Sequence, residues 1–138
     1  MIGTIRELSL LQSQEGFSLH VFLPEHLLER SSDMITEHLK QFNVQIISLS
    51  TENIYKAAGL IRKSHLDVLV YTDLGIDPFT HVLSFLRLAP VQTAFWGNPI
   101  LPESHEIDYF MVSEHHNSQH DDVFNPNPRK NSPQVVRL

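Results

Sequence analysis

Two short segments carry the residues whose types suit sugar or nucleotide chemistry. The first contains Asp73, Gly75 and Asp77, and it lies between a short apolar run and a helical pattern that begins with a proline. The second follows another apolar run and consists of Trp96, Gly97, Asn98 and Pro99. Carboxylate and amide oxygens accept hydrogen bonds from sugar hydroxyls, and an aromatic ring beside glycine stacks on a pyranose that the backbone approaches closely. Both segments are therefore candidates for a sugar-binding site.

Each segment also has a purely structural interpretation. Asp77 precedes Pro78, the order expected of a helix N-cap followed by the first helical position. Gly75 permits a tight turn that a Cβ atom would block. The ring of Trp96 could instead pack at the edge of a sheet, with Asn98 and Pro99 forming a plain turn. Spacing alone leaves both interpretations open.

Nine histidines raise the question of a metal site or a catalytic base. His115, His116 and His120 lie near Asp121 and Asp122, but their spacing matches no closed tetrahedral pattern and their surroundings are polar and rich in proline. We therefore expect no metal.

His65 and His81 are interpreted as helix-face residues and not as catalytic bases, because the sequence places no serine or aspartate partner for them. No nucleophile elbow, P-loop or complete dinucleotide fingerprint occurs, so no catalytic residue is assigned.

Short apolar runs alternating with helical patterns indicate which elements position these residues. We expect strands over 17–23, 44–49, 68–71, 91–96 and 107–112. Between them we expect a helix of about four turns within residues 24–42, with Pro24 or Glu25 in its first turn, a second helix capped by Ser50 or Thr51, and a third over 78–88. This alternation predicts an α/β fold, a Rossmann-like parallel sheet with helices on both faces. Residues 73–77 and 96–99 would then lie side by side at the carboxyl ends of their strands, where such sheets bind ligands.

The domain organisation follows from where the composition changes. Residues 1–112 are predicted to form one Rossmann-like domain, 113–133 a polar loop or disordered linker with three prolines, and 134–138 a short terminal strand. Because the chain stops within an apolar run, we expect a further element after it.

Composition and charge narrow the functional classes. The 138 residues are 41% hydrophobic and carry a formal charge of −6, with ten basic residues against sixteen acidic ones. Nucleic acid or an anionic membrane is therefore not expected as a partner, because either would require clustered cations. The chain has no cysteine, and its N-terminus resembles neither a secretory signal nor a membrane span. We expect an intracellular protein of the cytoplasm, or also of the nucleus in a eukaryote.

Four ordered blocks resemble a known family of glycosyltransferases. They span residues 66–78 with Asp73-Leu-Gly-Ile-Asp-Pro78, 86–92 with Arg87-Leu-Ala-Pro-Val-Gln92, 96–99 with Trp-Gly-Asn-Pro, and 107–110 with Ile-Asp-Tyr-Phe. The sequence is similar in these blocks to the O-GlcNAc transferases, including their bacterial and SPINDLY-like members. The similarity covers about residues 15 to 138 and part of the N-terminal half of that catalytic region.

The resemblance implies one half of a two-domain GT-B glycosyltransferase. Its donor would be a UDP-sugar, usually UDP-GlcNAc, its acceptors Ser or Thr hydroxyls of proteins, and no metal or other cofactor would be required. Trp96, Gly97, Asn98 and Pro99 would line the donor-sugar cleft, with Asp73, Gly75 and Asp77 supporting it from the neighbouring loop. The family places its proposed catalytic histidine before residue 1 of this chain and its nucleotide-binding residues in a C-terminal domain. Tetratricopeptide repeats often precede the catalytic region.

Two departures from the family pattern support a different interpretation. Asn98 stands where His or Tyr is usual, and residues 100–105 replace a loop of small residues. Because the resemblance also assigns proton abstraction and nucleotide binding to segments outside the chain, we expect that the chain alone transfers no sugar and binds UDP-sugars weakly at most. The alternative is a non-catalytic α/β module that binds proteins, and a third possibility is an unrelated nucleotide- or sugar-binding domain.

Overall fold

The computed structural model describes residues 2–30, 34–95, 104–113 and 133–137. It confirms an α/β fold with parallel strands, arranged in a two-stranded and a four-stranded sheet. The chain forms two compact units, Met1–Asn53 and Ile54–Leu138. Each unit is described by itself, and the domain boundaries expected from the sequence stay a prediction.

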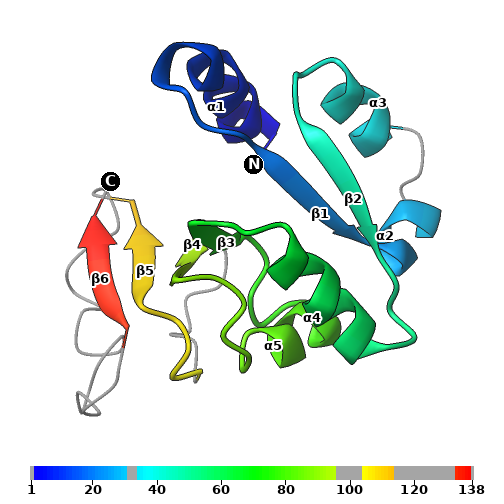
Figure 1. Ribbon diagram of the computed structural model, residues 1–138, viewed down its shortest axis with the longest axis vertical. Coiled ribbons are helices and arrows are strands. Elements are labelled where there is room, and N and C mark those ends of the chain that lie inside the picture. Colours follow the sequence, from blue (N-terminus) through cyan, green and yellow to red (C-terminus); the bar gives the residue numbers. More distant parts are fainter. Residues whose placement is uncertain (1, 31–33, 96–103, 114–132, 138) are drawn as a thin grey trace. The chain divides into compact units, whose positions relative to one another are not determined.

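The first unit is a β-α-β arrangement preceded by a helix (Figure 1). Strands β1 (His20–Pro24) and β2 (Gln45–Leu49) pair in parallel, with His20 opposite Gln45 and Pro24 opposite Leu49. Between the strands lie helices α2 (Glu25–Arg30) and α3 (Met34–Lys40). Of the two residues predicted for the first helical turn, Glu25 is confirmed, because it begins α2, whereas Pro24 ends β1. Residues 31–33 lie outside the described part of the chain.

Helix α1 (Ile2–Glu15) was not expected from the sequence, because its apolar residues do not gather on one face. Leu8, Leu10 and Leu11 are exposed, whereas two polar side chains, Ser9 and Gln12, are buried. The Gln12 amide accepts a hydrogen bond from the Leu19 backbone N–H at 3.2 Å and donates one to the Asn43 carbonyl. These two bonds tie α1 to the segments that enter β1 and β2.

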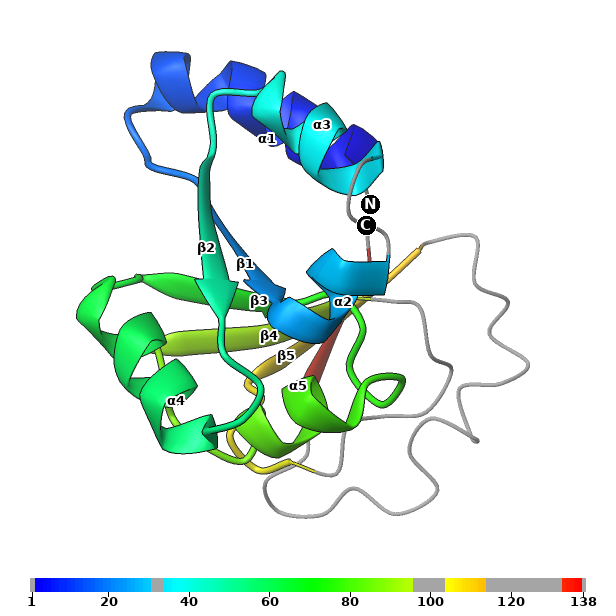
Figure 2. The same cartoon turned by 90° about the vertical axis from the view of Figure 1, so that its right-hand side faces the viewer.

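The second unit contains the four-stranded sheet, with strand order β3-β4-β5-β6 and every pair parallel. Its elements are α4 (Ile54–Lys63), β3 (Val68–Tyr71), α5 (Pro78–Leu83), β4 (Val91–Phe95), β5 (Tyr109–Val112) and β6 (Gln134–Arg137). Helices α4 and α5 lie on the same side of β3 and β4 (Figure 2). Strand β3 occupies the residues predicted for it, and β6 shows that part of the predicted terminal segment is a strand.

Small and branched side chains make the core of this unit. Helix α4 buries the face that the sequence spacing predicted, with Ala57, Ala58 and Ile61 each at most 3% exposed. On β3 the buried side chains, Leu69 and Tyr71, alternate with exposed ones, because successive residues of a strand point to opposite faces. Strand β4 is buried on both faces, with Gln92, Thr93 and Ala94 all buried. Helix α4 ends at Lys63, and His65 follows it with a left-handed φ of 48°, a conformation that glycine usually supplies after a helix.

Helix α5 is shorter than predicted, ending at Leu83 instead of reaching Leu88. Tertiary contacts explain the early end. In a helix that reached Leu88, the Leu88 backbone N–H would donate to the Ser84 carbonyl. Instead, the Leu88 N–H donates to the Gln92 side chain at 2.7 Å, and the Ser84 carbonyl accepts the Ser104 hydroxyl. Among the residues the structure describes, no helix is both long and apolar enough to cross a membrane.

Candidate functional site

The first candidate segment forms a tight turn directly after β3. The Ile76 backbone N–H donates to the Asp73 carbonyl at 3.0 Å, which closes a four-residue turn. Gly75 occupies the third position with φ 87°, the left-handed value that a type II turn requires there. Leu74 is buried and anchors the turn to the core, while Asp73 is half-buried. The glycine was thus correctly interpreted as a turn residue.

Asp77 caps helix α5. Its backbone is extended, with φ −98° and ψ 123°, and its Oδ2 accepts a hydrogen bond from the Thr80 backbone N–H at 3.0 Å. The Thr80 hydroxyl donates in return to the Asp77 carbonyl, also at 3.0 Å. Pro78 takes the first helical position, where its missing N–H has no consequence. The structural interpretation of Asp77 is therefore confirmed, and any contact between Asp77 and a sugar stays a prediction.

The register of β3 and β4 brings the ends of these strands to one edge of the sheet. Tyr71, the last residue of β3, lies opposite Ala94, the penultimate residue of β4. The chain therefore leaves both strands at the same carboxyl edge. The turn over 73–77 is described there, whereas the second segment of the candidate site, Trp96, Gly97, Asn98 and Pro99, lies outside the described residues.

The opposite, amino edge of the sheet holds a polar cluster that the sequence analysis did not find. Its centre is Gln92 on β4, whose side chain is 0% exposed. The amide oxygen accepts a hydrogen bond from the Leu88 backbone N–H at 2.7 Å, and the amide nitrogen donates to the carbonyls of Leu86 and Glu106 at 3.1 and 2.8 Å. One side chain therefore joins the loop before β4 to the loop before β5.

An ion pair lies beside this glutamine. The Arg87 guanidinium binds Asp108 through two nitrogens, at 2.6 and 3.2 Å, and Glu106 at 2.8 Å. Asp108 Oδ2 also accepts the Gln92 backbone N–H at 2.8 Å. The hydrogen bond from Arg87 is the main cause that lowers the pKa of Asp108 below its ordinary value, while burial works against it. Because these side chains are 33 to 40% exposed, water screens much of their attraction.

Two buried serines and a buried tyrosine complete the connections around α5. The Ser104 hydroxyl donates to the Ser84 carbonyl and accepts the Glu106 backbone N–H. The Tyr71 hydroxyl donates to the Leu83 carbonyl at 3.2 Å. Burial raises the pKa of Tyr71 above its ordinary value, and nearby Arg87 opposes this only partly. Tyr71 is thus an uncharged structural donor and no candidate for an acid or base at neutral pH.

The four sequence blocks of the family resemblance lie at two different edges of the four-stranded sheet. The blocks over 86–92 and 107–110 supply the cluster at the amino edge, whereas those over 66–78 and 96–99 end at or follow the carboxyl edge. A signal for the cluster was present in the sequence: Gln92 and Asp108 are polar residues inside predicted apolar runs. Because buried polar groups need partners, these two positions could have indicated a hydrogen-bond network.

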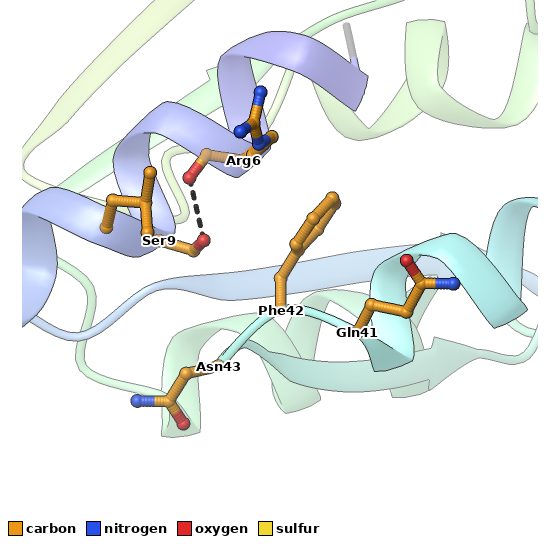
Figure 3. Close-up of a pocket in the computed structure, with 6 residues that line it drawn as sticks. Arg6, Ser9, Gln41, Phe42 and Asn43 are labelled. Atoms are coloured by element: carbon orange, nitrogen blue, oxygen red, sulfur yellow. Dashed lines mark hydrogen bonds between the residues drawn. The ribbon is translucent and has the colours of Figure 1, made fainter.

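A surface pocket of about 450 Å³ lies in the first unit (Figure 3). Its lining residues are Arg6, Ser9, Leu10, Gln41, Phe42 and Asn43. Figure 3 shows the amides of Gln41 and Asn43 pointing to different sides of the Phe42 ring, while the Ser9 hydroxyl bonds the Arg6 carbonyl at 2.7 Å. The polar groups do not converge on one point, so this pocket is a weaker ligand candidate than the carboxyl edge of the sheet.

No group of three or more His, Cys, Asp or Glu side chains that could hold a metal ion occurs among the described residues. The histidine-rich stretch that includes His115, His116 and His120 lies outside them.

These observations define the class of structure. It is a parallel α/β fold with a turn and a capped helix at the carboxyl edge of its larger sheet. Comparison with known proteins adds no family: no family model matches the chain, and no curated protein is significantly similar to it.

Proposed function

We propose that the chain is a glycosyltransferase-like domain that contacts a UDP-sugar, UDP-GlcNAc by resemblance, at the carboxyl edge of its four-stranded sheet. The protein that contains it would transfer the sugar to Ser or Thr hydroxyls of other proteins. The observation that carries the proposal is the common edge of β3 and β4, where the Asp73 turn follows one strand and Trp96 follows the other. Open parallel sheets bind ligands at this edge.

The described residues suit a supporting role in such a site. The turn over 73–77 is fixed at both ends, by the hydrogen bond of Ile76 to Asp73 and by the Asp77 cap of α5. A rigid turn holds its exposed backbone groups in place, and a preformed site loses less entropy when a ligand binds. Asp73 is the half-buried carboxylate of this turn that we assign to a sugar hydroxyl.

Transfer needs more than this edge. The acceptor hydroxyl oxygen would bond to the anomeric carbon, the bond from that carbon to the diphosphate oxygen would break, and a base would take the hydroxyl proton. Rate enhancement comes from orienting the reactants and stabilising charge on the leaving diphosphate. The resemblance assigns both tasks to segments outside these 138 residues. We therefore expect weak binding, with Kd about millimolar, and no turnover by the chain alone.

The single tryptophan makes binding directly measurable. Trp96 is the one Trp in the sequence, so its fluorescence reports on the second candidate segment without labelling. Titration with UDP-GlcNAc should change this emission saturably, and amide NMR spectra should show shifts at residues 73–77. Titrations with UDP alone and GlcNAc alone separate the contributions of the nucleotide and the sugar. Radiolabelled UDP-GlcNAc with an acceptor peptide tests turnover.

A matched pair of variants locates the site. Asp73→Asn removes a charge after the carboxyl end of β3, and Asp67→Asn makes the same change just before its amino end. The proposal requires that only Asp73→Asn weakens the response. Equal responses in the two variants, or NMR shifts confined to residues 86–92 and 104–108, would place the ligand elsewhere. Absence of any saturable response would remove the sugar-binding function.

The alternative is a non-catalytic module that binds proteins. One observation favours it: the Asp77 carboxylate, one of the candidate sugar contacts, serves as a helix cap. Absence of a UDP-GlcNAc response together with tight binding of a protein segment would support this alternative.

A further inference from the structure

Strand β3 forms one edge of the four-stranded sheet, because the strand order is β3-β4-β5-β6. The Asp67 carbonyl accepts the Val91 backbone N–H at 3.2 Å, so the backbone of Asp67 faces β4. Successive residues of a strand direct their N–H and C=O groups to opposite sides, so every second residue after Asp67 also faces β4. The N–H and C=O groups of Val68 and Val70 therefore point outward, where no strand among the described residues pairs with them.

This edge is open to solvent and apolar. Val68 and Val70 are 51 and 43% exposed. Strand β3 has the sequence Val-Leu-Val-Tyr, which contains neither a charged residue nor a proline. An exposed strand edge is a template for pairing with a further strand, and proteins usually protect it with charged side chains or proline. The β3 edge lacks both kinds of protection.

The opposite edge of the same sheet, formed by β6, has this protection. The Gln134 backbone N–H donates to the Asp108 carbonyl at 2.8 Å, so Val135 is the next residue whose backbone faces outward. Pro133, which directly precedes β6, has no N–H to offer, and Arg137, the last residue of β6, is charged and exposed. The contrast indicates that the β3 edge has a partner, because an unprotected edge otherwise promotes aggregation.

We propose that β3 pairs in antiparallel orientation with β3 of a second copy of the chain, across a two-fold axis. With Leu69 on the axis, Val68 of one copy lies opposite Val70 of the other, and each such pair exchanges two hydrogen bonds. The outward backbone groups of both valines are then satisfied. Residues directly opposite each other share one face of the sheet, so the valines of the two copies also contact each other. Asp67 lies opposite Tyr71, so no like charges meet.

The self-complementarity of the edge identifies the partner as a second copy. Every copy already presents the backbone groups and the valines that the other copy needs, in a register that a two-fold axis reproduces. Such a pair is closed, because it uses the β3 edge of both copies and leaves only the protected β6 edges outside. The product is a dimer with one continuous sheet and not a longer polymer. This inference does not depend on the proposed sugar site.

Sedimentation equilibrium of the whole chain tests the dimer and should show monomer and dimer but no larger species. Val70→Lys should raise the dissociation constant of the dimer by at least about tenfold, because it places a lysine of each copy in the contact. Val135→Lys is the matched control, since Val135 is the outward residue of β6 and is 40% exposed. It should change the dissociation constant less than about twofold. Circular dichroism and urea midpoints show whether both variants keep the fold.

Amide hydrogen exchange examines the edge in the unchanged chain, where no variant can disturb folding. The Val68 and Val70 amides should exchange slowly in the dimer and rapidly after dilution to the monomer. The Leu69 and Tyr71 amides, which face β4, should stay protected at both concentrations.

Introduced cysteines report the register, because the chain has no cysteine of its own. Mixed Val68→Cys and Val70→Cys chains should form disulfides with each other faster than with their own kind, since opposite Cα atoms lie about 5.5 Å apart, within the range of a disulfide. A monomer at every concentration, a species larger than the dimer, or equal weakening by Val70→Lys and Val135→Lys would each overturn the proposal. Slow exchange of the Val68 and Val70 amides in a monomer would do the same, because the edge would then be covered within one chain.

Discussion

Two adjacent residues of β4 test whether hydrogen bonding at the amino edge stabilises the second unit. Gln92 and Thr93 are both buried, at 0 and 5% exposed, and they point to opposite faces of the sheet. Gln92 makes three side-chain hydrogen bonds to backbone groups. The Thr93 hydroxyl has no hydrogen-bond partner among the described residues. Replacing each polar group by an apolar one should therefore have opposite effects on the free energy of unfolding.

Gln92→Leu removes the partners of the Leu88 N–H and of the Leu86 and Glu106 carbonyls. A buried polar group left without a partner costs about 1–3 kcal/mol. Leu88 is buried, so this cost applies in full to its N–H. Leu86 and Glu106 are half-buried, so water can reach their carbonyls and reduce the cost of the lost hydrogen bonds. The leucine side chain offsets about 1–2 kcal/mol through its own burial. We expect a net destabilisation of about 3 kcal/mol, a large part of the stability of an ordinary domain.

Thr93→Val is the matched control. Valine has nearly the same shape, so the exchange removes the unpartnered hydroxyl without opening a cavity. Stability should stay the same or rise by about 1 kcal/mol, because the cost of burying that hydroxyl disappears.

Urea denaturation followed by circular dichroism measures both variants. The midpoint should fall for Gln92→Leu and stay or rise for Thr93→Val, with similar slopes if the compactness of both states is unchanged. A loss below about 1 kcal/mol for Gln92→Leu would show that its hydrogen bonds add little to stability. A large loss for Thr93→Val would show that the hydroxyl has a partner.

Three further variants test local features of the second unit. Asp77→Ala removes the N-cap of α5 and should destabilise by about 1 kcal/mol in urea denaturation, whereas Asp77→Asn, which can still accept the Thr80 N–H, should not. His65→Gly should stabilise by about 0.5–1 kcal/mol in thermal denaturation, because glycine adopts the left-handed backbone after α4 without strain. Asp108→Asn tests the lowered pKa of Asp108. The ion pair of Asp108 with Arg87 stabilises the fold fully above the ordinary Asp pKa of about 4. This stabilisation is lost as the pH falls through the lowered pKa of the folded state. Acid denaturation should therefore be less steep below about pH 4 in Asp108→Asn than in the unchanged chain.

Local chemistry was sufficient to predict several elements from the sequence. The strand over Val68–Tyr71 and the buried face of α4 follow from the periodicity of apolar residues. The cap by Asp77 and the turn at Gly75 depend on groups within three residues of one another, so the sequence contains all the interacting partners. For these features, neighbouring residues alone decide the conformation.

Other features depended on contacts between distant residues. Helix α1 has no clear apolar face and is tied down by Gln12, whose amide bonds the Asn43 carbonyl 31 residues away. The early end of α5 follows from Gln92 and Ser104, which bond the Leu88 N–H and the Ser84 carbonyl that a helix reaching Leu88 would have joined to each other. Arg87 and Asp108 meet across 21 residues only because β4 and β5 adopt one particular parallel register. Periodicity and propensity describe neighbours along the chain, whereas the strand register that joins these groups is set by packing of the whole sheet.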